Sequence, residues 1–339
     1  MEQQIFERFP GISCAYKDVA GNVITECYGV ADKESNIPVD ENTIFPAYSI
    51  SKFVTAICVM KLQEKNMLDI DVPVNDYLHQ WKLLTTDGGE SNATIRTLMC
   101  HTSGIMDGED GFYGLRRTDP EVRLMDILEG RTFYNNRPVR SEKTPGTAFE
   151  YSDAGYCVLQ LLVEAVTNKA FEEAVRENIF EPLGLQNTFF ASAGNVTYFE
   201  KNRTMATGYD GEGMAIPGKF PSVPDLAASG LWGTPKELLS MAEEFVAAFH
   251  GRSEFLQEKS AREMAKPVDN FPWTGLGVFV NGNDMLMSQG WGECGQCMMK
   301  MNCKTGEIAV VMTNRNPEAD QTESGVEWLA DKNLRNGEV

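Results

Sequence analysis

Residues 45–53 read Phe-Pro-Ala-Tyr-Ser-Ile-Ser-Lys-Phe and place a serine and a lysine three positions apart, at Ser49 and Lys52. Apolar residues at helical spacing follow this S-x-x-K tetrad, which predicts a helix from about Ser49 to Glu64 with one apolar side. Residues three apart on a helix share a face, so Lys52 can reach the Ser49 hydroxyl. A serine hydroxyl is a weak nucleophile until a neighbouring base removes its proton. The tetrad marks Ser49 as a candidate nucleophile; the alternative is a serine cap followed by a solvated lysine.

A second polar segment, Tyr151-Ser152-Asp153, stands directly before another predicted helix. A tyrosine in such a loop can act as a general base or as a proton shuttle. Aspartate is a preferred helix N-cap, and the helix is expected to begin right after Asp153. Both roles are compatible for this residue, because a capping carboxylate can also face Lys52.

The remaining elements follow a simple order along the chain. Alternating apolar residues and turn signals predict strands near both ends, and helical spacing predicts helices between them. The expected strands cover residues 11–16, 22–28, 276–281, 285–288, 296–302 and 307–313, and the further helices cover residues 94–100, 153–166, 171–180, 235–250 and 323–334. This order predicts a single catalytic domain over residues 1–339, in which residues 1–70 and 225–339 form an α/β lobe and residues 71–224 form an inserted, mainly helical lobe.

Charge and composition exclude several classes of partner. The 339 residues include 30 Lys and Arg against 49 Asp and Glu, a formal net charge of −19. A nucleic-acid partner needs a basic face, so none is expected. No apolar run approaches the roughly 18 residues needed to span a bilayer. The N-terminus lacks the basic and apolar regions of a signal peptide, which predicts a cytoplasmic protein, although an exported form with its leader removed stays open.

Cysteine and histidine content argues against a metal or cofactor. The eight cysteines are expected to be reduced thiols, and the C-x-x-C pair Cys294 and Cys297 lacks a second ligand pair. Only three histidines occur, His79, His101 and His250, which leaves little room for a His-rich metal site. A nucleophilic serine in this chain therefore needs a base other than imidazole, unless one of these three supplies it.

These segments together resemble the serine β-lactamase and penicillin-binding-protein-like hydrolases, in the branch of class C β-lactamases, DD-peptidases and family VIII esterases. The motifs that carry the resemblance run in the family's order: residues 45–53, 101–105 (H-T-S-G-I), 151–156 (Y-S-D-A-G-Y), 182–185 and 230–234. The resemblance implies a β-lactamase/transpeptidase-like α/β (α+β) fold, an antiparallel sheet flanked by helices with an inserted helical lobe. It also implies a nucleophilic Ser49, an assisting Lys52, Tyr151 as partner in proton transfer and a covalent acyl-enzyme.

One departure from the family pattern is Asp153, where the family normally has asparagine. A carboxylate only accepts hydrogen bonds, and its charge would keep Lys52 protonated. Our hypothesis is that Lys52 then acts as an electrostatic partner and Tyr151 carries the role of base.

The other departure is the third motif, usually K-T-G or H-x-G on a strand lining the site. Lys304-Thr305-Gly306 spells K-T-G but falls in a hairpin turn before the last predicted strand. Ser288-Gln289-Gly290-Trp291 occupies the earlier strand position, and we favour it as the substrate-binding segment. In that alignment the backbone N–H groups of Trp291 and Ser49 would form the oxyanion hole.

This alignment lacks the motif's cation or imidazole, which weakens recognition of a substrate carboxylate. Arg315, after the last predicted strand, is a substrate-binding candidate that would compensate by bidentate pairing; the alternative is an exposed structural arginine. The chain is therefore expected to act on a small ester or amide, as an esterase or D-amino-acid peptidase with at most weak β-lactamase activity. An acyltransferase or macrocyclising thioesterase, or a penicillin-binding sensor with little turnover, would use the same nucleophile. In each case the expected partner of the protein is a small-molecule or short-peptide acyl substrate. The sequence does not specify an oligomeric state.

Overall fold

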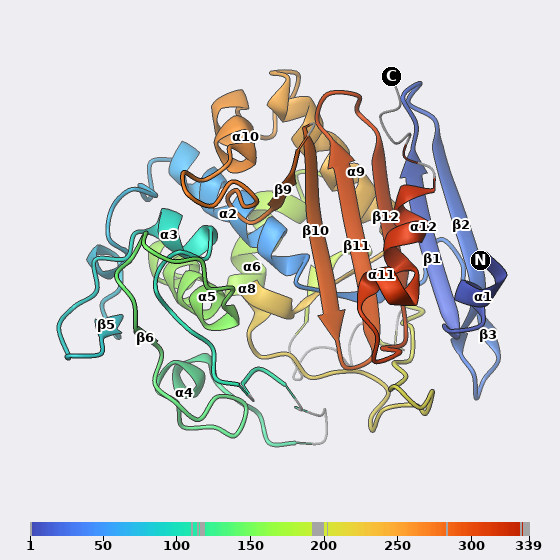
Figure 1. Ribbon diagram of the computed structural model, residues 1–339, viewed down its shortest axis with the longest axis horizontal. Helices are drawn as coiled ribbons and strands as arrows, with labels where there is room; N and C mark the ends of the chain where they lie inside the picture. The colour runs from blue at the N-terminus through green and yellow to red at the C-terminus, as the bar shows by residue number, and fades with distance from the viewer. Residues whose placement is uncertain are drawn as a thin grey trace.

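Strands from both ends of the chain lie side by side in one sheet (Figure 1). The structure, a computed structural model, describes residues 2–109, 111–113, 115, 119–191, 200–201, 203–282, 284–332 and 334. In this part of the chain the main sheet has seven strands, ordered β3-β2-β1-β12-β11-β10-β9, and every neighbouring pair is antiparallel. Its strands are β1 (Gly11–Lys17), β2 (Val23–Asp32), β3 (Ile37–Pro38), β9 (Phe279–Asn281), β10 (Met285–Gly292), β11 (Gly295–Asn302) and β12 (Ile308–Thr313).

Two small sheets and a set of helices complete the fold. The first small sheet has the order β4 (Phe45–Tyr48), β8 (Leu231–Gly233), β7 (Phe189–Phe190), and the second pairs β5 (Leu84–Thr85) with β6 (Arg140–Ser141). The helices are α1 (Glu2–Phe6), α2 (Ser51–Glu64), α3 (Ile95–Met99), α4 (Leu124–Leu128), α5 (Asp153–Thr167), α6 (Phe171–Val175), α8 (Leu226–Ser229), α9 (Pro235–Phe249), α10 (Glu258–Ala265), α11 (Gln321–Ser324) and α12 (Val326–Asp331), with short turns η1 (Val74–Asp76) and η2 (Arg176–Phe180).

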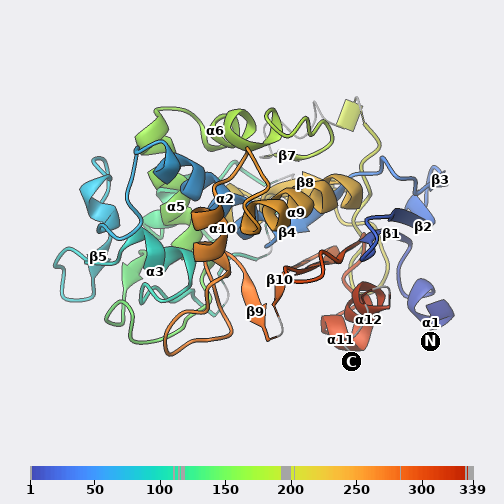
Figure 2. The ribbon, with the colours of Figure 1, turned by 90° about the horizontal axis from the view of Figure 1, so that it is seen from above.

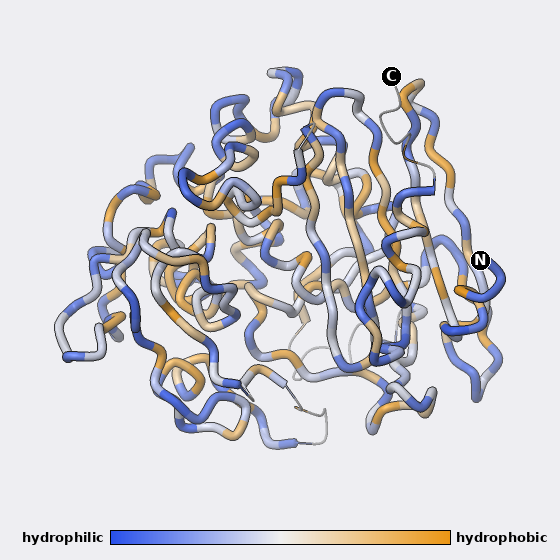
Figure 3. The backbone as a smooth tube through the Cα atoms, viewed as in Figure 1, coloured by the Kyte–Doolittle hydropathy of each residue, from blue (hydrophilic) through white to orange (hydrophobic). Residues whose placement is uncertain are grey.

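Helices cover both faces of the main sheet. Seen from above, α1, α11 and α12 lie on one side and α9, α2 and α10 on the other (Figure 2). Side chains alternate accordingly along β12: Val310 and Met312 join the large core, whereas Ala309 and Val311 join the smaller cluster under the terminal helices. Every residue of β12 is buried, as expected for a strand that is covered on both faces. Hydrophilic residues gather along the outer loops (Figure 3).

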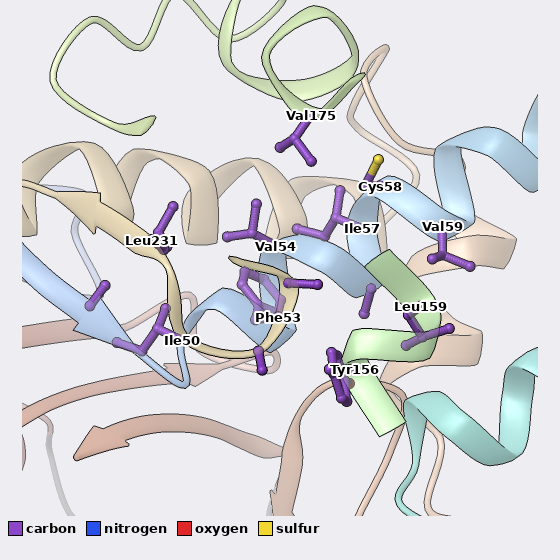
Figure 4. Packing of buried hydrophobic residues seen from close by; sticks show 14 of the residues in the cluster. Ile50, Phe53, Val54, Ile57, Cys58, Val59, Tyr156, Leu159, Val175 and Leu231 are labelled. Carbon is purple, nitrogen blue, oxygen red and sulfur yellow. The ribbon is translucent and has the colours of Figure 1, made fainter. Parts of the chain in front are cut away.

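Helix α2 lies at the centre of the molecule and directly follows the site segment. All its residues from Ser51 to Met60 are buried, and so is Leu62. Figure 4 shows Leu159, Val175 and Leu231, which come from three other elements, arranged around α2. The predicted location of the helix is confirmed, but the prediction of one apolar side is wrong, since a helix packed on all sides is apolar all round.

The predicted closing helix is divided in two. Gly325 separates α11 from α12 and adopts φ 93°, in the left-handed region that favours glycine. A Cβ at this position would lie 2.5 Å from Ile5, so the break also lets α1 pack closely. Helix α9 begins at a threonine cap: the Thr234 side chain accepts a hydrogen bond from the Glu237 N–H, and Pro235 occupies the first turn.

The core does not separate the two predicted lobes. One apolar cluster contains Leu159 of α5 as well as Val310 of β12, so elements of both lobes pack together. The exact lobe boundaries stay a prediction. Among the described residues, no helix is long and apolar enough to cross a membrane.

Candidate active site

Ser49 occupies a tight turn between β4 and α2. Tyr48, the last residue of β4, has φ 44°, a left-handed conformation that costs a non-glycine residue about 1 kcal/mol or more. The turn is held by Ser51, whose hydroxyl donates to the Tyr48 carbonyl at 2.5 Å and accepts from the Leu231 N–H at 2.9 Å. Helix α2 begins at Ser51, so Lys52 lies in its first turn, one residue further along.

Strand β10 passes very close to this turn. A Cβ on Gly292 would collide with the ring of Tyr48, and a Cβ on Gly290 would collide with Ala47 and Cys297. Glycine at these two positions lets the strand run beside the nucleophile segment. Cys297 donates from Sγ to the Ala47 carbonyl at 2.9 Å. The Sγ of Cys294 lies 3.0 Å from the Tyr48 hydroxyl, so the C-x-x-C residues pack behind Ser49 as thiols.

Lys52 connects the serine to a carboxylate. Its Nζ donates to Ser49 Oγ at 2.9 Å and to the Ala228 carbonyl at 3.0 Å, and it pairs with Asp153 Oδ1 at 2.5 Å. Burial is the largest single influence and lowers the pKa of Lys52, but the charges of Asp153 and Tyr151 and hydrogen bonds to both together outweigh it and raise the pKa above its ordinary value. Lys52 is therefore an ammonium group in the resting site and donates to the serine rather than accepting its proton.

Tyr151 lies on the same side of Ser49 as Lys52. The Lys52 ammonium is 4.9 Å from the centre of the Tyr151 ring, and that ring stacks on His101 with centroids 4.3 Å apart. Burial of the hydroxyl raises the pKa of Tyr151, while the positive charge of Lys52 and a hydrogen bond with Ser49 oppose the rise. His101 accepts from the Ser152 N–H at 3.1 Å, and burial holds its pKa well below the ordinary value. His101 is thus a neutral support for the tyrosine loop.

The predicted capping role of Asp153 is wrong, and its predicted contact with Lys52 is present. Ser152 caps α5, since its hydroxyl accepts from the Gly155 N–H at 2.9 Å. Asp153 is the first helical residue, which frees its carboxylate for Lys52.

Two further carboxylates near Asp153, the half-buried Asp107 and the buried Asp225, have no signal in the local sequence pattern. Asp107, which follows the H-T-S-G segment, accepts from Ser152 Oγ at 2.8 Å and from the Asp153 N–H at 2.6 Å. Asp225 accepts from the Tyr134 hydroxyl at 2.7 Å, and its other carboxylate oxygen is buried and has no hydrogen-bond partner among the residues that the structure describes. Burial, with the charge of Asp153 as second cause, raises the pKa of Asp107 to about 6 and that of Asp225 to about 7. Tertiary packing, not sequence spacing, brings these acids together.

The raised pKa of Asp225 predicts that removing its charge stabilises the protein. The folded pKa of about 7 exceeds the unfolded value of 3.8, so the folded state pays a penalty that develops as pH rises from about 4 to 7. Asp225→Asn keeps an acceptor for Tyr134 and should raise the free energy of unfolding by a few kcal/mol at about pH 8. Its effect should shrink toward pH 4, as measured by urea unfolding at both pH values. An equal gain in the free energy of unfolding at both pH values would contradict the raised pKa of Asp225.

Two cavities flank Ser49. The larger holds about 80 Å³ and is lined by Tyr48, Ser49, Phe112, Tyr113, Leu115, Tyr134, Asp153, Pro221, Ser222, Val223, Ser229, Trp291, Gly292 and Glu293. The narrower, about 10 Å³ and large enough for one water molecule, is lined by Ser49, Lys52, His101, Tyr151, Thr274, Gly277, Val278, Phe279, Met287, Ser288 and Gln289. The structure thus brings Ser49, Lys52, Tyr151 and Asp153 together with the 288–291 segment. An open groove of about 770 Å³ lies elsewhere, between α2 and α10, where Arg96 is already paired with Asp71 and Glu263.

Two of the candidate substrate-binding groups named from the sequence lie outside both cavities. Lys304-Thr305-Gly306 forms the turn between β11 and β12. Strand β10 pairs Met285 with Asn302 and Gly292 with Gly295, so this turn adjoins the opposite end of β10 from Gly292. Arg315 donates to the carbonyls of Arg8 at 2.9 Å and Asp210 at 3.2 Å, and it too lines neither cavity. Backbone carbonyls therefore occupy the guanidinium of Arg315, which favours a structural role for this residue over substrate binding.

Comparison with known proteins adds a family match over nearly the whole chain. The family model described as Beta-lactamase matches residues 1–332. Esterase EstB of Burkholderia gladioli is 27% identical over 262 residues, which cover 70% of this chain and 66% of that protein. A putative penicillin-binding protein, PbpX of Bacillus subtilis (strain 168), is 27% identical over 265 residues, covering 77% and 60%. The chain therefore spans less than two thirds of the length of these curated relatives.

Solved structures show the same fold. The octameric penicillin-binding protein homologue from Pyrococcus abyssi superposes with a TM-score of 0.77 at 23% identity, covering 97% of this chain and 75% of that one. The D-amino acid amidase from Ochrobactrum anthropi SV3 gives a TM-score of 0.78 at 22% identity, covering 98% and 94%. These likenesses establish the β-lactamase/transpeptidase-like architecture, an antiparallel sheet flanked by helices, that the sequence resemblance implied.

Proposed function

Because the chain belongs to the Beta-lactamase family of serine hydrolases, we propose that it cleaves small, uncharged esters or amides through an acyl-enzyme on Ser49. The observation that supports this most strongly is the Lys52 ammonium, which lies 2.9 Å from Ser49 Oγ and 2.5 Å from Asp153 Oδ1. A buried cation fixed beside a hydroxyl stabilises the alkoxide that forms when the hydroxyl loses its proton. Tyr151, on the same side of the serine, is the proposed base.

The proposed reaction has two halves that share this base. Deprotonated Tyr151 takes the Ser49 proton as Oγ attacks the substrate carbonyl, and the C–O or C–N bond then breaks as Tyr151 returns that proton to the leaving group. Water next attacks the acyl-enzyme from the place that the leaving group vacated. It gives a proton to Tyr151, and Tyr151 passes a proton to Ser49 Oγ as the bond between Oγ and the acyl carbon breaks. Backbone N–H groups of Ser49 and Trp291 are the proposed oxyanion hole; both residues border the larger cavity.

The polar groups beside Ser49 favour an uncharged substrate. In the alignment that we favour, Ser288 of β10 takes the place of the lysine or histidine of the family's third motif, so this position would offer a hydroxyl instead of a cation. Asp153 and Glu293 bring carboxylates to the larger cavity. A substrate carboxylate would be repelled there, which argues against β-lactams and carboxyl-terminal peptides.

A substrate panel tests this proposal directly. Purified protein would be incubated with p-nitrophenyl acetate and butyrate, D- and L-phenylalanine amides, and a chromogenic cephalosporin, with products quantified by chromatography. We expect turnover of the esters or amides and little of the cephalosporin. Added amine acceptors separate an acyltransferase from a hydrolase, and a long-lived adduct without product would instead indicate a penicillin-binding sensor. Cephalosporin turnover faster than that of every ester and amide would contradict the proposal.

The pKa directions predict how rate depends on pH. The base must lose its proton to act, and the pKa of Tyr151 is raised above its ordinary value, so kcat/KM should keep climbing as pH rises through the alkaline range. The charge of Asp153 contributes to raising the pKa of both Tyr151 and Lys52. Asp153→Asn removes that charge and should shift the rising limb to lower pH, by about one pH unit. An unchanged pH–rate profile would refute the hypothesis that Asp153 keeps Lys52 protonated.

A further inference from the structure

An aromatic shelf borders the narrow cavity on the Tyr151 side, formed by Phe149, Tyr151, Phe271, Trp273 and Phe279. Tyr151 and Phe279 are parallel, with centroids 6.1 Å apart. Phe149 lies 5.9 Å from Trp273 and 6.4 Å from Phe271, and Phe271 and Trp273 meet edge to face at 5.7 Å. Rings at these separations stabilise one another and offer a shared apolar surface.

The two groups of rings in the shelf are joined through His101, whose ring lies 4.3 Å from that of Tyr151 and 5.9 Å from that of Phe149, and the shelf is partly open to solvent. Tyr151 and Phe279 line the narrow cavity together with Ser49, and Thr274, next to Trp273, lines it as well. Trp273 keeps 48% of its surface exposed, and Tyr151 keeps 40%. Exposed aromatic rings gathered at the mouth of a cavity form a surface that an apolar ligand can cover.

Backbone hydrogen bonds fix the loop that carries the outer part of the shelf. The Phe271 N–H donates to Val268 at 3.0 Å, the Thr274 N–H to Phe271 at 3.1 Å and the Val280 N–H to Trp273 at 2.8 Å. The rings are thus held before any ligand arrives, which reduces the entropic cost of binding.

The position of the general acid determines which part of a substrate contacts this shelf. A general acid must lie within hydrogen-bond reach of the atom that it protonates, so the leaving oxygen or nitrogen has to sit beside the Tyr151 hydroxyl. The group attached to that atom therefore extends along the Tyr151 side of Ser49. The acyl group, bonded to the carbonyl carbon, extends toward the larger cavity that contains Trp291.

We propose that the aromatic shelf is a leaving-group subsite that binds an apolar, preferentially aromatic, alcohol or amine portion of the substrate. This inference rests on the proposed function and names its substrate class. In the acylation step the bond between the carbonyl carbon and the leaving oxygen breaks as the bond to Ser49 Oγ forms, and the serine proton ends on the released alcohol. The shelf holds that alcohol's ring throughout.

The same subsite must select acceptors in the second half of the reaction. An acceptor alcohol attacks the acyl-enzyme from the place that the leaving alcohol vacated, because one step is the reverse of the other. An alcohol with an aromatic ring should therefore compete with water better than methanol does. Its proton passes to Tyr151 and then to Ser49 as the Oγ–carbonyl bond breaks.

The test compares benzyl acetate with methyl acetate in wild type, Trp273→Ala, Trp273→Phe and Phe133→Ala. Trp273→Ala should lower kcat/KM for benzyl acetate about 10-fold and leave that for methyl acetate within about twofold. Trp273→Phe should restore most of the benzyl preference. Phe133 is an exposed aromatic residue, 59% accessible, that lines neither cavity, so Phe133→Ala should match wild type.

A second arm varies the acyl group and the acceptor. Methyl phenylacetate carries its ring on the acyl side, so Trp273→Ala should leave kcat/KM for this ester unchanged. With the acetyl-enzyme formed from methyl acetate, Trp273→Ala should also lower the yield of benzyl acetate from added benzyl alcohol about 10-fold relative to hydrolysis.

The outcomes separate the two proposals. If Trp273→Ala lowered kcat/KM equally for benzyl and methyl acetate, or lowered it for methyl phenylacetate, the leaving-group subsite would be overturned. Ser49-dependent hydrolysis would still stand in that case. Hydrolysis that persists in Ser49→Ala would instead overturn the proposed function, and with it the subsite.

Discussion

Ser49→Ala is expected to abolish ester hydrolysis, lowering kcat about 10⁴-fold or more. The reason is chemical: alanine has no atom that can form the acyl-enzyme, and the Lys52 ammonium loses the hydroxyl that it contacts at 2.9 Å. Initial rates with p-nitrophenyl acetate, measured beside the thermal midpoint of unfolding, separate a lost nucleophile from a lost fold.

A matched control is Ser240→Ala. Ser240 is an exposed serine of α9 whose hydroxyl donates only to a helical carbonyl, that of Lys236, at 3.1 Å. This variant should keep the wild-type rate. If Ser49→Ala kept more than a few per cent of the wild-type rate while folded, Ser49 would not be the nucleophile.

Lys52→Met is expected to reduce the free energy of unfolding by about 3–5 kcal/mol. The lysine side chain is only 3% exposed, and its removal leaves the Asp153 carboxylate without its cation, close to Asp107. A buried charge that loses its partner keeps its desolvation cost and loses the attraction that offset it. Urea unfolding at about pH 8, where the carboxylates are ionised, measures the loss.

Two variants show whether the cause is the unpaired charge. The double variant Lys52→Met, Asp153→Asn should regain most of the lost free energy, because it removes the carboxylate too. Lys236→Met breaks an exposed pair with Glu41, in which both side chains are about half exposed, and should cost less than about 1 kcal/mol. A double variant no more stable than Lys52→Met alone would contradict the explanation.

Local patterns made part of the site predictable. Ser49 and Lys52 are three residues apart at a helix start, so their contact follows from helix geometry alone. The favoured placement of Ser288 and Trp291 followed from strand order, and the register of β10 brings both beside Ser49. The K-T-G sequence at Lys304 shows why a matching motif alone is insufficient, because its turn adjoins the end of β10 opposite to Gly292 and lines neither cavity.

Other features depend on tertiary packing and left no local signature. Asp107 and Asp225 come from loops far apart in sequence. Hydrogen bonds to Ser152 and Asp153 hold Asp107 beside the start of α5, and the packing of α8 on α5 brings Asp225 near Asp153. The all-round burial of α2 also required the fold, since its apolar residues already satisfied a one-sided pattern. Arg315 followed a strand, as a substrate-binding arginine could, but backbone carbonyls occupy it.

Covalent labelling of Ser49 tests the central claim most directly. Wild type and Ser49→Ala would each be treated with a fluorophosphonate, a penicillin and a p-nitrophenyl ester, followed by intact mass spectrometry and peptide mapping. The account predicts one fluorophosphonate adduct on wild type, located within the peptide that contains Ser49, and none on Ser49→Ala. Labelling that survives in Ser49→Ala, or that maps to another residue in wild type, would contradict it.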